Sequence, residues 1–128
     1  MKRLAAPVYL ILMYVATAAT ALLDTSRLPP TLLELRNVLI HSSAFLVLAL
    51  VVRWSAGILD RLLTPSETRL LLLLALGLGI GQELLQTLIR QRVFPVNSLF
   101  DLCVDTGGAA LGLWLGSRLL TRLQKQAQ

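Results

Sequence analysis

Residues 81–116 read GQELLQTLIRQRVFPVNSLFDLCVDTGGAALGLWLG, and this stretch decides how the rest of the chain is interpreted. Two apolar helical segments meet here across a short polar connection. Acidic side chains interrupt both: Glu83 lies near the end of the first segment, and Asp101 and Asp105 lie near the start of the second. Because ionisable groups inside long apolar runs are costly and rare, they usually mark function. We therefore ask whether the rest of the chain forms a membrane scaffold around these acids.

The composition is typical of a membrane protein. Of the 128 residues, 55% are hydrophobic and only 15% are charged, and the mean hydropathy is +0.72; in soluble domains roughly a quarter of the residues are charged. The net charge is +5, but the basic residues lie between apolar runs rather than in a patch with aromatics, so we expect no nucleic-acid partner. Cys103 is the only cysteine, which excludes an intrachain disulfide and metal sites made of two or four cysteines.

Four apolar runs are each about as long as the roughly 20 helical residues that cross a bilayer. They predict an all-α, four-transmembrane-helix bundle in a single domain, residues 1–128, with spans at about 4–23, 37–54, 70–89 and 99–120. Residues 4–23 have a rival interpretation as a signal peptide, because Ala19-Thr20-Ala21 resembles a cleavage site. The run is longer than a typical signal core of about 7–15 residues, so we favour an uncleaved span.

Connections between the spans are short, which predicts up-down connectivity. Ser98 and Asp101 form a Ser-x-x-Asp helix-cap pattern, and Thr64 and Glu67 form a capping box with a proline between them. Eight of the twelve Lys and Arg residues lie in the two tails and the second connection, and four lie in the first and third connections. Positive charge favours the cytoplasmic side, so both termini are predicted to be cytoplasmic in a multi-pass membrane protein.

This arrangement places the polar groups of three spans at one depth. His41, Glu83 and Asp105 lie four to six residues from the predicted ends of their helices, which is roughly 6–9 Å at 1.5 Å per residue. Pairing them avoids most of the cost of unpaired charge in hydrocarbon. We therefore predict an outward-facing polar pocket that binds a ligand and is lined by His41, Glu83, Gln86, Arg90, Arg92, Asp101 and Asp105.

Each of these residues also has a purely structural interpretation. In that interpretation His41 bonds a backbone carbonyl or Ser43, Asp101 only caps its helix, and Arg90 or Arg92 anchors the chain at the interface. Arg53, beside Trp54, is likewise expected at the membrane–water interface. Glycines spaced by four predict close helix packing, at Gly77 and Gly81 and along a seam of Gly108, Gly112 and Gly116 that also allows a homo- or hetero-oligomer.

In this set of residues the chain resembles the VanZ-like family of small membrane proteins, named for a teicoplanin-resistance protein. The family pattern is a His near the start of one span, then E-x-x-Q, an Arg, and D-x-x-x-N-x-x-G. Here it corresponds to His41, Glu83 with Gln86, Arg92, and the run from Asp101 through Asp105 to Gly108. The family Asn is Asp105, and the Asp-Lys pair before the family His is replaced by Asn37-Val38. The connection from Arg92 to Asp101 is also about three residues longer than the family's.

The resemblance implies a small multi-pass protein of the bacterial plasma membrane, with about four spans and a link to glycopeptide resistance. Three functions are compatible with the residues. One is a non-enzymatic protein whose pocket binds membrane lipid head groups or a lipid-linked envelope precursor, which we favour, with no cofactor and no metal. Another is an intramembrane metal-dependent or acid–base enzyme acting on a lipid-linked substrate. A third is a small transport or assembly subunit.

Overall fold

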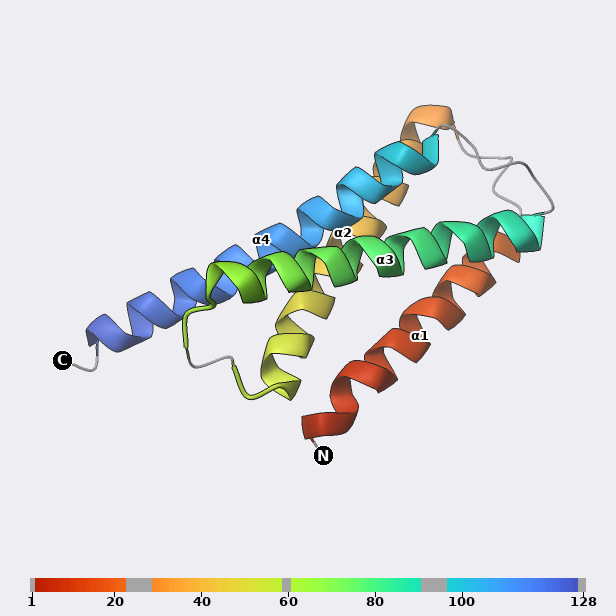
Figure 1. Ribbon diagram of the computed structural model, residues 1–128. Helices are drawn as coiled ribbons and strands as arrows, with labels where there is room; N and C mark the ends of the chain where they lie inside the picture. Colours follow the sequence, from red (N-terminus) through yellow and green to blue (C-terminus); the bar gives the residue numbers. More distant parts are fainter. Residues whose placement is uncertain (1, 23–28, 59–60, 91–96, 127–128) are drawn as a thin grey trace.

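A computed structural model describes residues 2–22, 29–58, 61–90 and 97–126. These residues form four helices: α1 (Lys2–Leu22), α2 (Pro30–Ser55), α3 (Pro65–Arg90) and α4 (Asn97–Gln126). Successive helices run in opposite directions, so the start of α1 and the end of α4 lie at the same end of the bundle as the α2–α3 connection (Figure 1). The predicted all-α bundle is confirmed. The side of the membrane that this end faces stays a prediction.

By length and composition, four segments of these helices can cross a membrane: Leu4–Leu22, Thr31–Ser55, Pro65–Arg90 and Ser98–Leu119. Large apolar side chains cover their outer surfaces; Leu73 and Leu88, for example, are 65% and 75% exposed. In water such a surface would be a severe liability, whereas in a bilayer it faces lipid. The chain is therefore a multi-pass membrane protein.

Two helices are longer than the spans predicted for them. The second was expected to begin near residue 37, but α2 begins at Pro30, and the last continues beyond residue 120 to Gln126. Pro29 precedes the helix, and its carbonyl accepts bonds from Leu32 N (3.0 Å) and Leu33 N (3.1 Å). A proline at the first helical position costs no helical hydrogen bond, because the backbone N–H of that position has no partner inside the helix. The Pro29-Pro30 pair therefore starts α2 rather than belonging to a loop.

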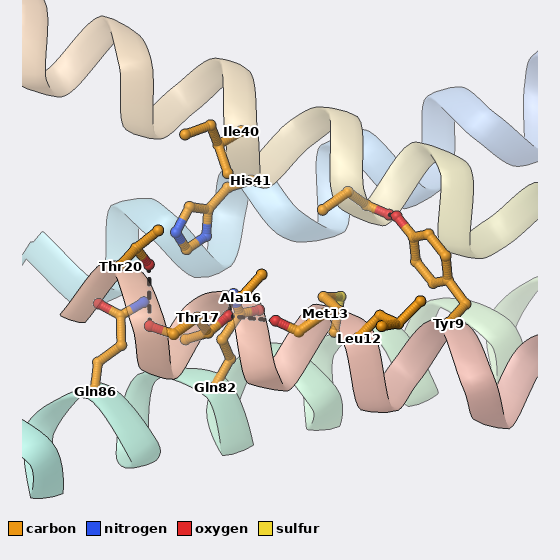
Figure 2. Close-up of a pocket in the computed structure, with 11 residues that line it drawn as sticks. Tyr9, Leu12, Met13, Ala16, Thr17, Thr20, Ile40, His41, Gln82 and Gln86 are labelled. Carbon is orange, nitrogen blue, oxygen red and sulfur yellow. Dashed lines mark hydrogen bonds between the residues drawn. The ribbon is translucent and has the colours of Figure 1, made fainter. Parts of the chain in front are cut away.

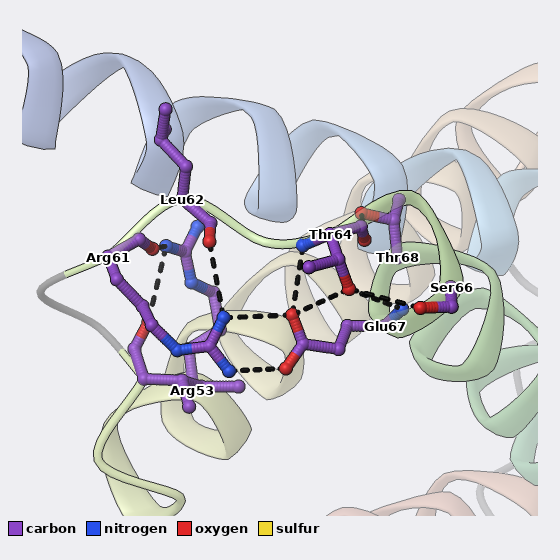
Figure 3. A network of polar contacts seen from close by, with 8 residues as sticks. Arg53, Arg61, Leu62, Thr64, Ser66, Glu67 and Thr68 are labelled. Carbon is purple, nitrogen blue, oxygen red and sulfur yellow. Dashed lines mark hydrogen bonds and ion pairs between the residues drawn. The ribbon is translucent and has the colours of Figure 1, made fainter.

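The start of α3 follows the capping-box prediction (Figure 3). Thr64 N donates to Glu67 Oε2 (2.9 Å), and Glu67 N donates to Thr64 Oγ1 (3.3 Å). Glu67 also forms a two-pronged ion pair with Arg61, in which Nη1 lies 2.9 Å from Oε2. These hydrogen bonds raise the pKa of the Arg61 guanidinium. Reciprocal capping and the ion pair fix where the chain enters α3.

The glycine seam of α4 packs against α2 of the same chain. A Cβ added at Gly108 would lie 2.3 Å from the backbone oxygen of Ser42, and one at Gly112 would lie 2.5 Å from that of Leu46. At Gly116 it would meet the guanidinium of Arg53 at 2.7 Å. The absence of side chains along this seam lets the two helices touch. The predicted seam is thus occupied within the chain, and this face of α4 is not free for a second subunit.

The two glycines predicted to pack on α3 differ from each other. A Cβ at Gly81 would lie 2.7 Å from the hydroxyl of Tyr14 on α1, so a neighbour does approach closely there. Gly77 was predicted wrongly: it is exposed, and a Cβ there would meet nothing within 4 Å. The intervening Gly79, which we did not single out, faces α4 instead. A spacing of four identifies a shared face, but not whether a helix covers it.

Arg53 is buried within the protein, with 0% of its surface exposed, while its neighbour Trp54 is 42% exposed. The expected position of Arg53 at the membrane–water interface stays a prediction. Its Nη1 donates to Leu113 O (3.1 Å) and Ser117 Oγ (3.2 Å) on α4. Its Nη2 donates to Arg61 O (2.8 Å) and Ile58 O (3.4 Å) beyond the end of α2. Arg53 therefore ties the end of α2 to α4 and to the following connection through backbone carbonyls.

Candidate functional site

His41 and Asp105 form a buried pair between α2 and α4. The His41 Nδ1 lies 2.9 Å from the Asp105 Oδ1, and the two side chains are 10% and 0% exposed. Helix contact at Gly108 explains the pair: Gly108 is three residues after Asp105, and its partner Ser42 follows His41. Because the two backbones touch there, the nearby side chains of His41 and Asp105 can reach each other. In the neutral ring with its proton on Nδ1, the Nδ1–H donates to Asp105 and Nε2 keeps a lone pair.

The second oxygen of Asp105, Oδ2, is buried without a hydrogen-bond partner. It lies against α3, where a Cβ added at Gly79 would come within 2.9 Å of it. Any larger residue at position 79 would force the carboxylate or α3 to shift. Gly79 was missed by the sequence reasoning, although its place between Gly77 and Gly81 was a usable signal.

Glu83 lies on the same face of α3 as Gly79, one turn further along. It is 4% exposed, and its Oε2 accepts a 2.5 Å hydrogen bond from Ser98 Oγ, while Oε1 has no partner. Ser98 was predicted to cap α4 together with Asp101. It lies inside the first turn of α4 instead, fully buried, and holds the Glu83 carboxylate. Two acids predicted to share a site thus have separate partners along one α3–α4 contact.

A cavity of about 270 Å³ lies between α1, α2 and α3, bounded by His41 at one side (Figure 2). Figure 2 shows the imidazole of His41 projecting from α2 over Thr17 and Thr20 of α1. The described residues that line the cavity are Tyr9, Leu12, Met13, Ala16, Thr17, Thr20, Ile40, His41, Ala44, Gln82 and Gln86. Most are apolar, so the cavity combines apolar walls with a polar side.

Hydrogen bonds between α1 and its two neighbouring helices hold the cavity walls together. The Tyr9 hydroxyl donates to Ala44 O on α2 (2.9 Å), and the Tyr14 hydroxyl donates to Leu78 O on α3 (2.8 Å). Gln82 Nε2 donates to Thr17 Oγ1 across the α1–α3 contact (2.6 Å). Sequence reasoning gave no role to Thr17 or Gln82. The only available signal was a polar residue inside an apolar run, and it is a weak one.

The predicted pocket residues therefore separate into groups. His41 and Asp105 meet directly, and Gln86 lines the same cavity as His41. Asp101 lines a different hollow of about 390 Å³ at the start of α2 and α4, with Glu34, Asn37 and Phe100. Arg90 is exposed at the end of α3, and Arg92 lies outside the described residues. Among the described residues, no group of three or more His, Cys, Asp or Glu side chains is placed to hold a metal ion.

The arrangement is suited to holding a polar group inside the membrane. His41 is positioned by Asp105 with one ring nitrogen left over, next to amide and hydroxyl groups of α1 and α3. A held imidazole with a lone pair can accept a hydrogen bond or a proton. Comparisons of this chain with protein-family models, with curated proteins and with solved structures found no match.

Proposed function

We propose that this chain is a VanZ-like protein of the bacterial plasma membrane that binds the polar end of a membrane amphiphile, such as a lipid head group or a lipid-linked envelope precursor. The observation that carries the proposal is the cavity beside His41, whose walls are mainly apolar and whose polar side is buried in the bundle. Through bound envelope components, the protein would alter susceptibility to glycopeptides such as teicoplanin.

Energetics favour an occupant for this cavity. Polar groups within the hydrocarbon region are costly unless they are paired. The cavity is lined by His41 and by Gln82, whose side-chain oxygen Oε1 is buried and paired by no described residue. An amphiphile can pair such groups with its polar end while its chain remains among apolar side chains. A small hydrophilic solute would gain the first contact but not the second.

The proposal is tested by lipids that co-purify with the protein. Wild type and His41→Phe are purified from the same membranes, and bound lipids are extracted and identified by mass spectrometry. Phenylalanine keeps the ring volume and removes both nitrogens. Wild type should retain a lipid species that His41→Phe loses. Thr68→Val removes a hydroxyl whose bond to Thr64 O is local to the other end of α3, so it should match wild type.

The result that would contradict the proposal is the same lipid profile in all three proteins, provided that circular dichroism shows equal helix content. Teicoplanin susceptibility of cells expressing each variant is a separate measurement. If the lipid difference is present but susceptibility is unchanged, amphiphile binding stands and the link to glycopeptides is wrong.

Acid–base chemistry on the bound lipid is a second candidate, favoured by the His41–Asp105 geometry. Asp105 orients the ring through Nδ1, which leaves Nε2 free to take a proton from a bound hydroxyl or water. Incubating the retained lipid with purified protein distinguishes catalysis from binding. A change in lipid mass with wild type, absent with His41→Phe, would indicate catalysis; an unchanged lipid would indicate binding alone.

A further inference from the structure

The hydroxyl groups of the cavity have already used their hydrogens. Tyr9 donates to Ala44 O (2.9 Å), Thr17 to Met13 O (2.9 Å), and Thr20 to Thr17 O (3.0 Å). A hydroxyl has one hydrogen and two lone pairs. These three side chains can therefore offer a ligand in the cavity only acceptors, even though each is nominally both donor and acceptor.

The same bonds fix the orientation of Gln82. Because Thr17 donates its hydrogen to Met13 O, its oxygen accepts the 2.6 Å bond from the Gln82 side chain, so the atom nearest Thr17 must be the amide nitrogen. The amide oxygen, Oε1, is then the free end. It is buried without a partner in a side chain that is only 5% exposed and that lines the cavity. An orphaned acceptor of this kind lacks a donor.

His41 adds one more acceptor when its ring is neutral with the proton on Nδ1. That proton is then donated to Asp105, and Nε2, the other ring nitrogen of this cavity-lining residue, carries a lone pair. Among the described residues, the lining contains no lysine or arginine, and its remaining donors are the amide of Gln86 and the second N–H of Gln82. Phosphate groups in proteins are held by several N–H donors and basic side chains. The described part of the cavity wall, by contrast, offers mainly hydrogen-bond acceptors and no basic side chain.

We propose that the cavity between α1, α2 and α3 selects amphiphiles whose polar end is a hydrogen-bond donor, an alcohol or an ammonium group, over those that end in a phosphate. The inference rests on the proposed function, because it specifies the chemistry of the amphiphile. The size of the cavity is compatible with a small head group and the first part of one acyl chain, since 270 Å³ corresponds to about nine water molecules at roughly 30 Å³ each.

Three photoreactive probes test the preference. They share one ten-carbon chain with a diazirine near the polar end, and they terminate in a hydroxyl, an amine or a phosphate. Wild-type protein is labelled in detergent, and the modified residues are located by mass spectrometry. The hydroxyl probe, the amine probe or both should label cavity residues such as Leu12, Met13 and Ile40 several-fold more than the phosphate probe does. The ratio of labelling by the hydroxyl probe to labelling by the amine probe distinguishes an alcohol from an ammonium ligand.

Two variants make the test sharper. Gln82→Leu removes the orphaned acceptor and should lower labelling by the donor probes about two- to tenfold, the range expected for one hydrogen bond. Its unfolding midpoint should fall modestly, because the variant also loses the Gln82 bond to Thr17, although the Thr17 hydroxyl keeps its own bond to Met13 O. Thr106→Val, which removes a hydroxyl bonded only within α4, is the matched control and should label like wild type.

The second variant is designed to reverse the preference. Thr20 is exposed at the cavity rim near the end of α1, so a lysine there can reach the interface and supply a cationic donor. Thr20→Lys should raise the phosphate-to-hydroxyl labelling ratio several-fold. The control is Ala19→Lys, at a neighbouring position that is also exposed but does not line the cavity. It should leave the phosphate-to-hydroxyl labelling ratio unchanged.

The outcomes separate the two proposals. Equal or stronger labelling of the wild-type cavity by the phosphate probe would overturn the donor preference but leave amphiphile binding intact. No cavity labelling by any probe would overturn the cavity as an amphiphile site altogether. An unchanged ratio in Thr20→Lys would overturn the argument that missing donors are what exclude phosphate.

Discussion

Replacing Gly108 by alanine gives a quantitative test of the α2–α4 contact. A Cβ at this position would lie 2.3 Å from Ser42 O and 2.8 Å from Ser42 Cα. Ordinary contacts between such atoms are about 3.5–4.0 Å, so the helices would have to separate by about 1 Å. The obstacle is backbone, so no side chain can rotate away to relieve it. We expect Gly108→Ala to be destabilised.

Gly107→Ala is the matched control one residue away. A Cβ there meets nothing within 4 Å. Both variants gain the same improvement in helix propensity, about 0.5–1 kcal/mol, so it cancels when they are compared. The difference between their free energies of unfolding then isolates the overpacking cost, about 1–3 kcal/mol. Gly107→Ala itself should be neutral or slightly stabilised.

The free energy of unfolding is measured by titrating detergent-solubilised protein with dodecyl sulfate and following helix content by circular dichroism. The same measurement on Gly112→Ala should resemble Gly108→Ala, because its Cβ would lie 2.5 Å from Leu46 O. If Gly107→Ala and Gly108→Ala agree within about 0.5 kcal/mol, the ordinary range for surface substitutions, the helices do not touch as described and the reasoning is refuted.

Three further expectations follow from single contacts. Asp105→Asn keeps an acceptor for His41 Nδ1–H and should fold and retain lipid like wild type; loss of folding would show that the negative charge itself is required. Ser98→Ala removes the hydrogen bond to Glu83 and should destabilise the protein by about 1–3 kcal/mol, but much less in a Glu83→Leu background; equal costs in both backgrounds would exclude the pairing. In a Cys103→Ser background, Asn97→Cys should react with an impermeant thiol reagent in intact cells and Gln126→Cys should not; the reverse pattern would invert the proposed orientation.

The number and placement of the helices were largely predictable because they depend on local properties of the chain. Length and hydropathy identify a segment that can span a bilayer, and the reciprocal cap at Thr64 and Glu67 fixes where α3 begins. Helix ends were less predictable, because a polar segment can continue a helix beyond the hydrocarbon. The early start of α2 at Pro30 is such a case.

The choice of partners within the site was not predictable from the sequence. Depth places His41, Glu83 and Asp105 in one layer, but the rotation of each helix about its own axis decides which side chains meet. That rotation depends on how the helices pack, including where Gly79 lies against Asp105. As a result Asp105 bonds His41 while Glu83 bonds Ser98, a residue whose spacing also suits a helix cap.

The same packing explains why binding and stability should be separable by mutation. His41 and Arg53 are 12 residues apart on α2, roughly 18 Å of helix, and each makes a polar contact to α4 beside a seam glycine. Thus α2 and α4 are fastened at both ends. By contrast, α1 packs only on α2 and α3 within the described residues and is joined to them by hydrogen bonds such as that of Tyr9. The cavity lies on this more weakly attached side. Larger side chains at the seam glycines should therefore mainly lower the free energy of unfolding, whereas changes at the α1 wall should mainly alter what the protein binds.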